Sequence, residues 1–260
     1  MITAFISAIG TAAGLVVDKI TLSRERMALR VYLPLVFTFL CGFTLLLTPL
    51  LGRIDFTIAF LPNSLFLLLL MVIVAIAWNV LFYQSVKKER IYEHEVITMT
   101  APLITVLLAA VFFPEERDTT NFILALVASI ALFVARREKA RFILDRDGYN
   151  LLLGVILMSV ENILFRELLY SYTPVALYAV RTFILACFFM ASYSPRYKQV
   201  SIRHWWLIAG SALIGVISMV TKLYAFAEIG IIYTTLIGLL TPLLVFFASW
   251  EIFHEKIRAR

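Results

Sequence analysis

Residues 83–115, YQSVKKERIYEHEVITMTAPLITVLLAAVFFPE, and residues 224–255, YAFAEIGIIYTTLIGLLTPLLVFFASWEIFHE, follow one pattern. In both, a Pro-Leu pair comes 19 or 18 residues after a Tyr, and a Glu comes 13 residues after the Pro. Four landmarks in one order at nearly constant spacing indicate an internal repeat. The landmarks are Tyr83, Pro102, Leu103 and Glu115 in the first copy, and Tyr224, Pro242, Leu243 and Glu255 in the second.

The composition places this repeat in a membrane. Of the 260 residues, 62% are apolar and 15% are charged, against about 45–50% and about 25% in soluble domains. Only helices satisfy their own backbone groups over spans of about 20 residues in lipid, and alternating barrel strands are absent from the sequence. The sequence therefore predicts an all-α fold, a polytopic transmembrane helical bundle. Nine spans are expected, at about residues 2–22, 31–51, 63–86, 95–113, 119–136, 149–168, 174–192, 204–227 and 230–253.

The same composition excludes a secreted disulfide scaffold, a disordered tail and a large soluble catalytic domain. Both cysteines, Cys41 and Cys187, lie in apolar segments, which is typical of small core residues. No signal peptide is expected, because the first apolar run contains Asp18 and Lys19.

Positive charge alternates from one connection to the next. Eighteen of the 23 Lys and Arg follow the first, third, fifth, seventh and ninth spans, and only Arg53, Arg117 and Arg166 lie on the opposite side. The positive-inside rule then puts the amino terminus outside and Arg260 in the cytoplasm. Because the cations are spread over many loops, nucleic acid is not expected as a partner.

The repeat divides the chain into a first unit at residues 1–138 with five spans and a second unit at residues 148–260 with four. Because five is odd, the second unit enters the membrane from the opposite side, which is the inverted repeat common in secondary transporters. The repeat predicts a tenth span, which is apparently missing, and truncation is the interpretation we favour.

The landmarks resemble the EamA-type family of the drug/metabolite transporter superfamily. The resemblance implies paired five-helix repeats, transport of a small organic metabolite, a plasma (inner) membrane location and an amino terminus inside, contrary to the charge bias. It is carried by Leu81-Phe82-Tyr83, Thr100-Ala101-Pro102-Leu103 and Glu115-Glu116-Arg117, by Tyr224-Ala225-Phe226, Thr241-Pro242-Leu243 and His254-Glu255-Lys256, and by Thr173-Pro174 with Arg181-Thr182-Phe183.

Charged residues within the spans are the first candidates for a site, because such residues usually face a cavity or the bundle interior. Glu161 and Arg181 lie at similar depth on neighbouring helices, where an ion pair is either structural or responsive to substrate and protons. Lys222 either reaches the interface or lines a cavity. Asp18 and Lys19 are adjacent and are expected to compensate each other at the interface. Glu161 is the preferred proton carrier and Asp18 the weaker candidate.

Uncharged polar residues complete the candidate site. Trp78, Asn79 and Tyr83 share a region of the third span and are candidates for recognising a solute, together with Thr241. Gly10 and Gly14 form a small-xxx-small pattern that favours close helix packing. Pro102 and Pro242 are expected to kink their helices.

These residues favour a secondary transporter that moves a small organic solute outward by alternating access. The alternative is an integral membrane enzyme without transport activity, or an assembly subunit. No catalytic motif, metal site or cofactor site is expected. The expected partners are the lipid bilayer and a small-molecule solute, and a homodimer is left open.

Overall fold

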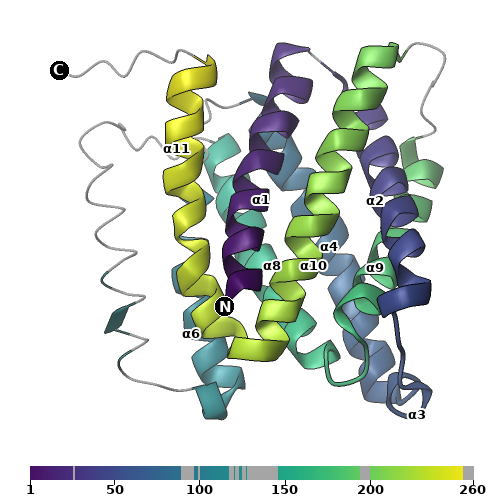
Figure 1. Cartoon of the computed structure of the whole chain (residues 1–260), viewed down its shortest axis with the longest axis vertical. Coiled ribbons are helices and arrows are strands. Elements are labelled where there is room, and N and C mark those ends of the chain that lie inside the picture. The colour runs from purple at the N-terminus through teal and green to yellow at the C-terminus, as the bar shows by residue number, and fades with distance from the viewer. Residues whose placement is uncertain are drawn as a thin grey trace.

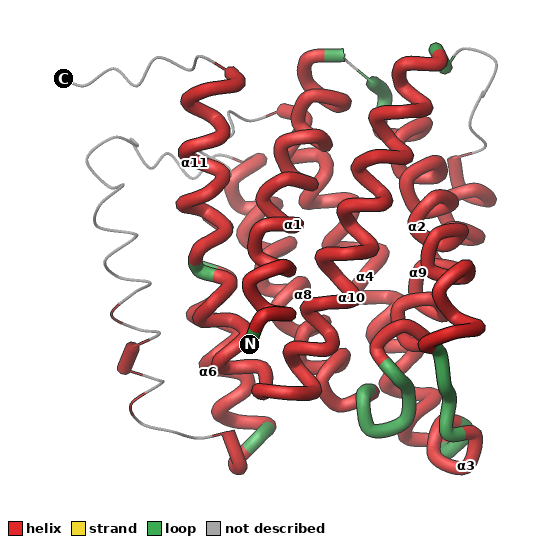
Figure 2. The backbone as a smooth tube through the Cα atoms, viewed as in Figure 1, coloured by secondary structure: helices red, strands yellow, loops and turns green. Residues whose placement is uncertain are grey.

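We analysed a computed structural model of the chain. It describes residues 1–25, 27–88, 97–98, 100–116, 120, 123–124, 127, 146–193 and 200–253. The described part is helical, with no strand beyond the isolated bridge between Ile54 and Tyr172 (Figures 1 and 2). The elements are α1 (Ile2–Lys19), the π-helical turn η1 (Ile20–Arg24), α2 (Leu29–Leu51), α3 (Phe56–Ala59), α4 (Pro62–Lys88), α6 (Ala101–Phe112), the 3-10 turn η2 (Pro114–Glu116), α8 (Arg146–Leu168), α9 (Pro174–Tyr193), α10 (Ile202–Gly238) and α11 (Leu240–Phe253).

The all-α bundle predicted from composition is confirmed, and the helices lie close to the expected spans. Five segments are long and apolar enough to cross a membrane, and Ala101–Phe112 is a shorter apolar helix. The expected span at 119–136 lies outside the described residues except for a few positions. The five long segments are Ile2–Ser23, Leu29–Leu51, Pro62–Lys87, Pro174–Tyr193 and Ile202–Val245.

Helix pairing follows a symmetric scheme in which the first helix of each half packs on the third helix of the other. Thus α1 packs on α10 and α8 packs on α4, while α2 packs on α9 (Figure 1). In the same way α6 packs on α8, and α11 packs on α1. Exchanging the halves leaves this list of pairs unchanged, as an inverted repeat requires. The unit boundaries at 138 and 148 remain a prediction, and both lie at or beside residues that are not described.

The connections between helices also join the two halves at both ends of the bundle. At one end the backbones after α2 and α8 bond to each other, with Asp55 N donating to Ser171 O at 3.0 Å and Thr173 N to Arg53 O at 3.0 Å. At the other end Arg203, at the start of α10, forms an ion pair of 2.9 Å with Glu25, just after η1. The core therefore continues across the seam between the halves.

Helix α10 contains the break that the sequence predicts between its last two spans. Gly230 has φ of 81°, which only glycine adopts without strain, and it divides α10 into residues 202–229 and 231–238. The carboxylate of Glu116 fills the space beside Gly230 and accepts hydrogen bonds from Ile231 N at 2.8 Å and Ile232 N at 3.1 Å. Glu116 also pairs with Arg166 of α8 at 3.1 Å. The helix after the break thus has a negatively charged cap at its amino end.

Candidate functional site

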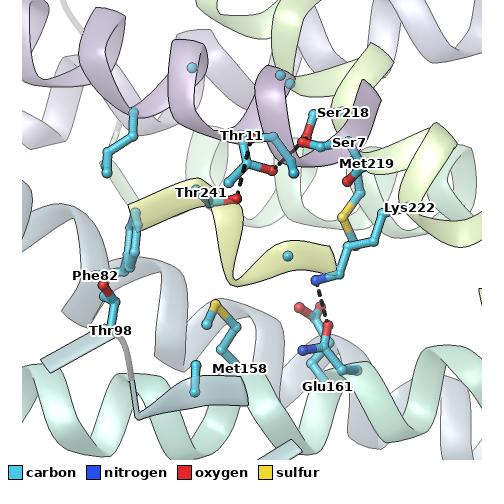
Figure 3. Close-up of a pocket in the computed structure, with 18 of the residues that line it drawn as sticks. Ser7, Thr11, Phe82, Thr98, Met158, Glu161, Ser218, Met219, Lys222 and Thr241 are labelled. Carbon is cyan, nitrogen blue, oxygen red and sulfur yellow. Dashed lines mark hydrogen bonds between the residues drawn. The ribbon is translucent and has the colours of Figure 1, made fainter. Parts of the chain in front are cut away.

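A cavity of about 320 Å³ lies between the two halves. Its walls come from α1, α2, α4, α6, α8, α9, α10 and α11, so that residues distant in sequence face one space (Figure 3). Every residue that the sequence predicts for substrate binding or proton coupling lines this cavity, although these roles remain predictions. They are Asp18, Trp78, Asn79, Tyr83, Glu161, Arg181, Lys222 and Thr241.

Glu161 and Arg181 form the ion pair that the sequence left open. Arg181 Nε donates to Glu161 Oε1 at 2.7 Å and Nη2 donates to Oε2 at 3.3 Å, while Trp78 Nε1 donates to Oε2 at 2.7 Å. Glu161 is 1% exposed and Arg181 is 3% exposed. A two-pronged contact of this kind fixes both side chains. Trp78 contributes from the other half of the molecule, so this bond also ties α4 to α8.

Lys222 lines the cavity rather than reaching the end of its helix. Its ammonium donates to Asn162 Oδ1 at 2.9 Å and lies 5.4 Å from the centre of the Phe226 ring. No carboxylate among the described residues forms an ion pair with it. An ammonium has three N–H donors, so most of the capacity of Lys222 is directed to the cavity (Figure 3).

Asp18 occupies the corresponding place in the first half, and the expectation of an interfacial pair with Lys19 is wrong. Asp18 is 7% exposed and accepts hydrogen bonds from Tyr32 at 2.5 Å and from Ser211. Tyr83 contributes a further hydroxyl to the same carboxyl. Lys19 instead donates to Val86 O at 2.7 Å. Adjacent residues of a helix point about 100° apart, so neighbours in sequence meet different helices.

Three of the uncharged candidates are held by nearby groups at the edge of the cavity. Asn79 is 2% exposed and donates to Ala75 O of its own helix at 2.7 Å. Thr241 donates to Ala8 O of α1 at 3.2 Å, which links α11 to α1. The Tyr83 ring meets the Tyr32 ring edge-on at 5.5 Å between centroids. These contacts fix the side chains around the cavity.

The close helix approach predicted at Gly10 is confirmed. A Cβ atom added there would lie 2.9 Å from Ser218 Cβ of α10, whereas at Gly14 the nearest atom would be Ile214 Cγ2 at 3.7 Å. At the crossing Thr11 and Ser218 share a hydrogen bond of 2.7 Å, and Ser218 donates to Ser7 O at 3.0 Å (Figure 3). Small polar residues thus form the seam between α1 and α10.

The landmark prolines lie at helix starts rather than at kinks within helices. Pro102 is in the first turn of α6, and Pro242 is in the first turn of α11, after the turn at Leu239. A proline fits there because first-turn amides have no partner within the helix. Of the landmark glutamates, Glu115 belongs to η2 and its side chain is not described, and Glu255 lies outside the described residues.

Several residues of the site were not predicted. Tyr32 lies at the start of a span, where an aromatic residue is typical of the membrane interface, yet it is fully buried against Asp18. Asn162 directly follows Glu161, and this position beside a charged residue within a span could have identified it from the sequence. Glu116 stands beside a landmark glutamate and makes the capping contacts described above. In the described part of the chain, no group of three or more His, Cys, Asp and Glu could hold a metal ion.

Comparisons with known proteins agree with this architecture. The sequence profile of the EamA-like transporter family matches residues 149–260. No curated protein gives a significant match. A solved structure described as "Crystal structure of protein" has a TM-score of 0.66 and 16% identity, covering 96% of this chain and 89% of that chain. At this identity the likeness shows the fold alone.

Proposed function

We propose that this chain, whose residues 149–260 match the EamA-like transporter family, moves a small organic solute across the membrane by alternating access. The family match and the long apolar helices support a multi-pass membrane transporter. The observation that carries the finer proposal is the cavity between the halves, which collects four charged side chains from both of them. A space of about 320 Å³ suits a small metabolite.

Alternating access is supported by the contacts that join the halves at each end of the cavity. At one end Glu116 holds together α8 and the break in α10, and Thr3 donates to Glu228 at 3.1 Å. At the other end Arg203 of the second half pairs with Glu25 of the first. Each end of the cavity is thus closed by few polar contacts. The contacts at one end can break while those at the other end remain.

The test is counterflow of labelled solutes in liposomes that contain the purified protein. A panel of organic acids, amino acids, amines, sugars and nucleosides is loaded inside, and uptake of the labelled form is measured. We expect at least one class to be taken up faster than in empty liposomes. Uptake equal to empty liposomes for every class would refute the proposal.

A plugged variant and a matched control connect any flux to the cavity. A Cβ atom added at Gly238 or at Gly42 meets no atom within 4 Å. Gly238 lines the cavity and Gly42 does not. Gly238→Phe should therefore abolish counterflow, and Gly42→Phe should retain it. Equal flux in the two variants would place the solute path elsewhere.

For the driving ion, the contacts favour Asp18 over Glu161 as a proton carrier, which reverses the order expected from sequence. Glu161 already has its counter-charge in Arg181, at 2.7 Å. Asp18 is surrounded by hydroxyls from three helices, Tyr32 of α2, Tyr83 of α4 and Ser211 of α10, while Lys19 points to Val86 O. A proton is then the simplest counter-charge for this carboxylate. A pH-sensitive dye inside the liposomes should report proton movement when solute is added, and an unchanged dye signal during solute flux would refute coupling to protons.

Location in the plasma (inner) membrane and an outside amino terminus are also proposals. The charge bias supports them, since Lys19, Lys87 and Arg203 lie at the same end of the bundle. Single cysteines at Arg53 and at Lys87 would lie at opposite ends. An impermeant thiol reagent on intact cells should label only the Arg53 position, and labelling of only the Lys87 position would reverse the orientation.

A further inference from the structure

We propose that the solute is a small organic anion, whose carboxylate or similar monoanionic head binds Lys222 and whose remainder is uncharged and largely apolar. This inference rests on the proposed function, because it concerns the same cavity. It narrows the solute from any small metabolite to one class of charge and shape.

The first step is the charge balance of the cavity. Four charged side chains line it in the part of the chain that the structure describes, two acidic and two basic. Arg181 and Glu161 neutralise each other through two direct hydrogen bonds. Lys222 and Asp18 remain, and each lacks an ion-pair partner among the described residues.

The second step is the distance between these two remaining groups. Asp18 is bonded to Ser211, and Ser211 precedes Lys222 by 11 residues on the uninterrupted first segment of α10. At 1.5 Å per residue this separation is about 16 Å along the helix. Asp18 therefore does not neutralise Lys222, and a compact zwitterion does not reach both.

The third step is the hydrogen-bonding capacity of Lys222. One of its three donors is used by Asn162 Oδ1, at 2.9 Å. The Asn162 bond and the Phe226 ring hold the ammonium in place without supplying a negative charge. A partly buried cation that lines a cavity is stabilised most by a counter-ion with hydrogen-bond acceptors. A solute carboxylate supplies both, whereas an amine adds repulsion from Lys222.

The fourth step is the wall beside the ammonium. The side chains of Met158 and Met219 point into the same space as Lys222, and Phe82 lines it further along (Figure 3). Trp78 also lines this cavity. Methionine side chains are flexible and adapt to apolar groups of different shape. The remainder of the solute is therefore apolar, and its exact outline is less restricted than its charge.

The experiment uses two series of probes that differ only in the head group. One series is 3-phenylpropanoate, its amide, phenylalanine and 3-phenylpropylamine, and the other is hexanoate, hexanamide and hexylamine. Binding to the purified full chain is measured as a shift of the unfolding temperature in detergent, and counterflow is measured in liposomes. We expect a carboxylate to bind about tenfold or more tightly than its amide, zwitterion or amine.

Three variants assign this preference to Lys222. Lys222→Met keeps the apolar stem and should remove the preference for the anion, while Lys222→Arg should keep most of it. Thr221→Val is the matched control, because Thr221 bonds only to its own helix at Ile217 O and Ser218 O and does not line the cavity. Without ligand, Lys222→Met should unfold at about the same temperature, since Lys222 forms no ion pair with a described residue.

The outcomes separate this inference from the proposed function. Tighter binding of an amide, zwitterion or amine, or an anion preference retained in Lys222→Met, overturns the anion class. Failure of every carboxylate to bind overturns it as well. Counterflow of an uncharged or cationic solute, blocked by Gly238→Phe, would in either case leave the proposed transport function standing.

Discussion

Asp18 and Glu161 are carboxylates at matching places in the two halves, and their surroundings differ in one respect. Each lies on the first helix of its half, and each contacts the second helix of its own half and the third helix of the other. For Glu161 these partners are Arg181 and Trp78, and for Asp18 they are Tyr32 and Ser211. The partner on the second helix is the cation Arg181 for Glu161 and the hydroxyl of Tyr32 for Asp18.

The difference separates a carboxylate that has a cationic partner from one that has none. Removing one partner of a buried ion pair leaves the other charge uncompensated, so the burial of Glu161 and that of Arg181 depend on each other. Hydroxyl donors stabilise a carboxylate without neutralising it. The proposed roles follow this difference, with Glu161 and Arg181 as a structural pair and Asp18 as the group that exchanges a proton.

The largest expected effect breaks the ion pair. Arg181→Met leaves Glu161 buried without its cation, and we expect a loss of about 3–5 kcal/mol in the free energy of unfolding. The measurement is unfolding in mixed detergent micelles. The double variant Arg181→Met with Glu161→Gln should recover a large part of the loss, and a double variant no better than the single one would show that the charge of Glu161 does not cause it.

The glycines that precede the two carboxylates give the next effect. Gly10 lies eight residues before Asp18 and Gly154 lies seven before Glu161, and each packs on the third helix of the other half. An added Cβ would be 2.9 Å from Ser218 Cβ at Gly10, but 3.3 Å from Leu81 Cβ at Gly154. We expect Gly10→Ala to lower the stability by about 1–3 kcal/mol and Gly154→Ala by less.

The control for both is Gly42→Ala, where no atom lies within 4 Å. There the higher helix propensity of alanine should leave stability unchanged or slightly increased. The unfolding temperature in detergent ranks the three variants. If Gly10→Ala is no worse than Gly42→Ala, the close contact between α1 and α10 does not exist.

A smaller effect compares the donors on the two carboxylates. A double-mutant cycle of Tyr32→Phe with Asp18→Asn should give a coupling energy of about 1–2 kcal/mol, because the Tyr32 hydroxyl is one of few donors to Asp18. The cycle of Trp78→Phe with Glu161→Gln should give less, since Arg181 keeps two bonds to Glu161. Equal couplings would mean that Arg181 does not shield Glu161 from the loss of a donor.

The smallest expected effect concerns Asp55. Like Asp18 it accepts a hydrogen bond from a hydroxyl group, but it is exposed to water. Asp55 accepts hydrogen bonds from the hydroxyl and the amide of Thr57 at the start of α3, and these hold the pKa of the exposed carboxyl below 3.8. A carboxyl whose pKa is lowered in the folded protein stabilises the fold at pH values above its ordinary pKa. This contribution to stability is lost as the pH falls through the pKa of the folded state. At pH 7 this contribution is present but small, because the carboxyl is exposed to water. Asp55→Asn should therefore lower the unfolding temperature only slightly at pH 7, and a large drop would contradict the solvent-exposed assignment.

The sequence predicted the fold and the charged part of the site for physical reasons. Charges within apolar spans are rare and costly, so Glu161, Arg181 and Lys222 stood out, and helical depth brought the first two together. The direction of side chains was harder to predict from the sequence. Because Asp18 and Lys19 are adjacent in sequence they were expected to pair, although the two residues face different helices. Tyr32 was missed because an aromatic residue at a span end looks the same whether it faces lipid headgroups or a buried carboxylate.

The central claim is that Asp18 exchanges the proton that drives solute movement. It is tested most directly by measuring, in one set of liposomes, both counterflow at equal pH and net flux under a pH gradient for the solute identified by the panel. The account predicts that Asp18→Asn keeps counterflow and loses the response to the gradient, while the wild type shows both. A wild-type flux that ignores the gradient, or an Asp18→Asn flux still driven by it, would contradict the account.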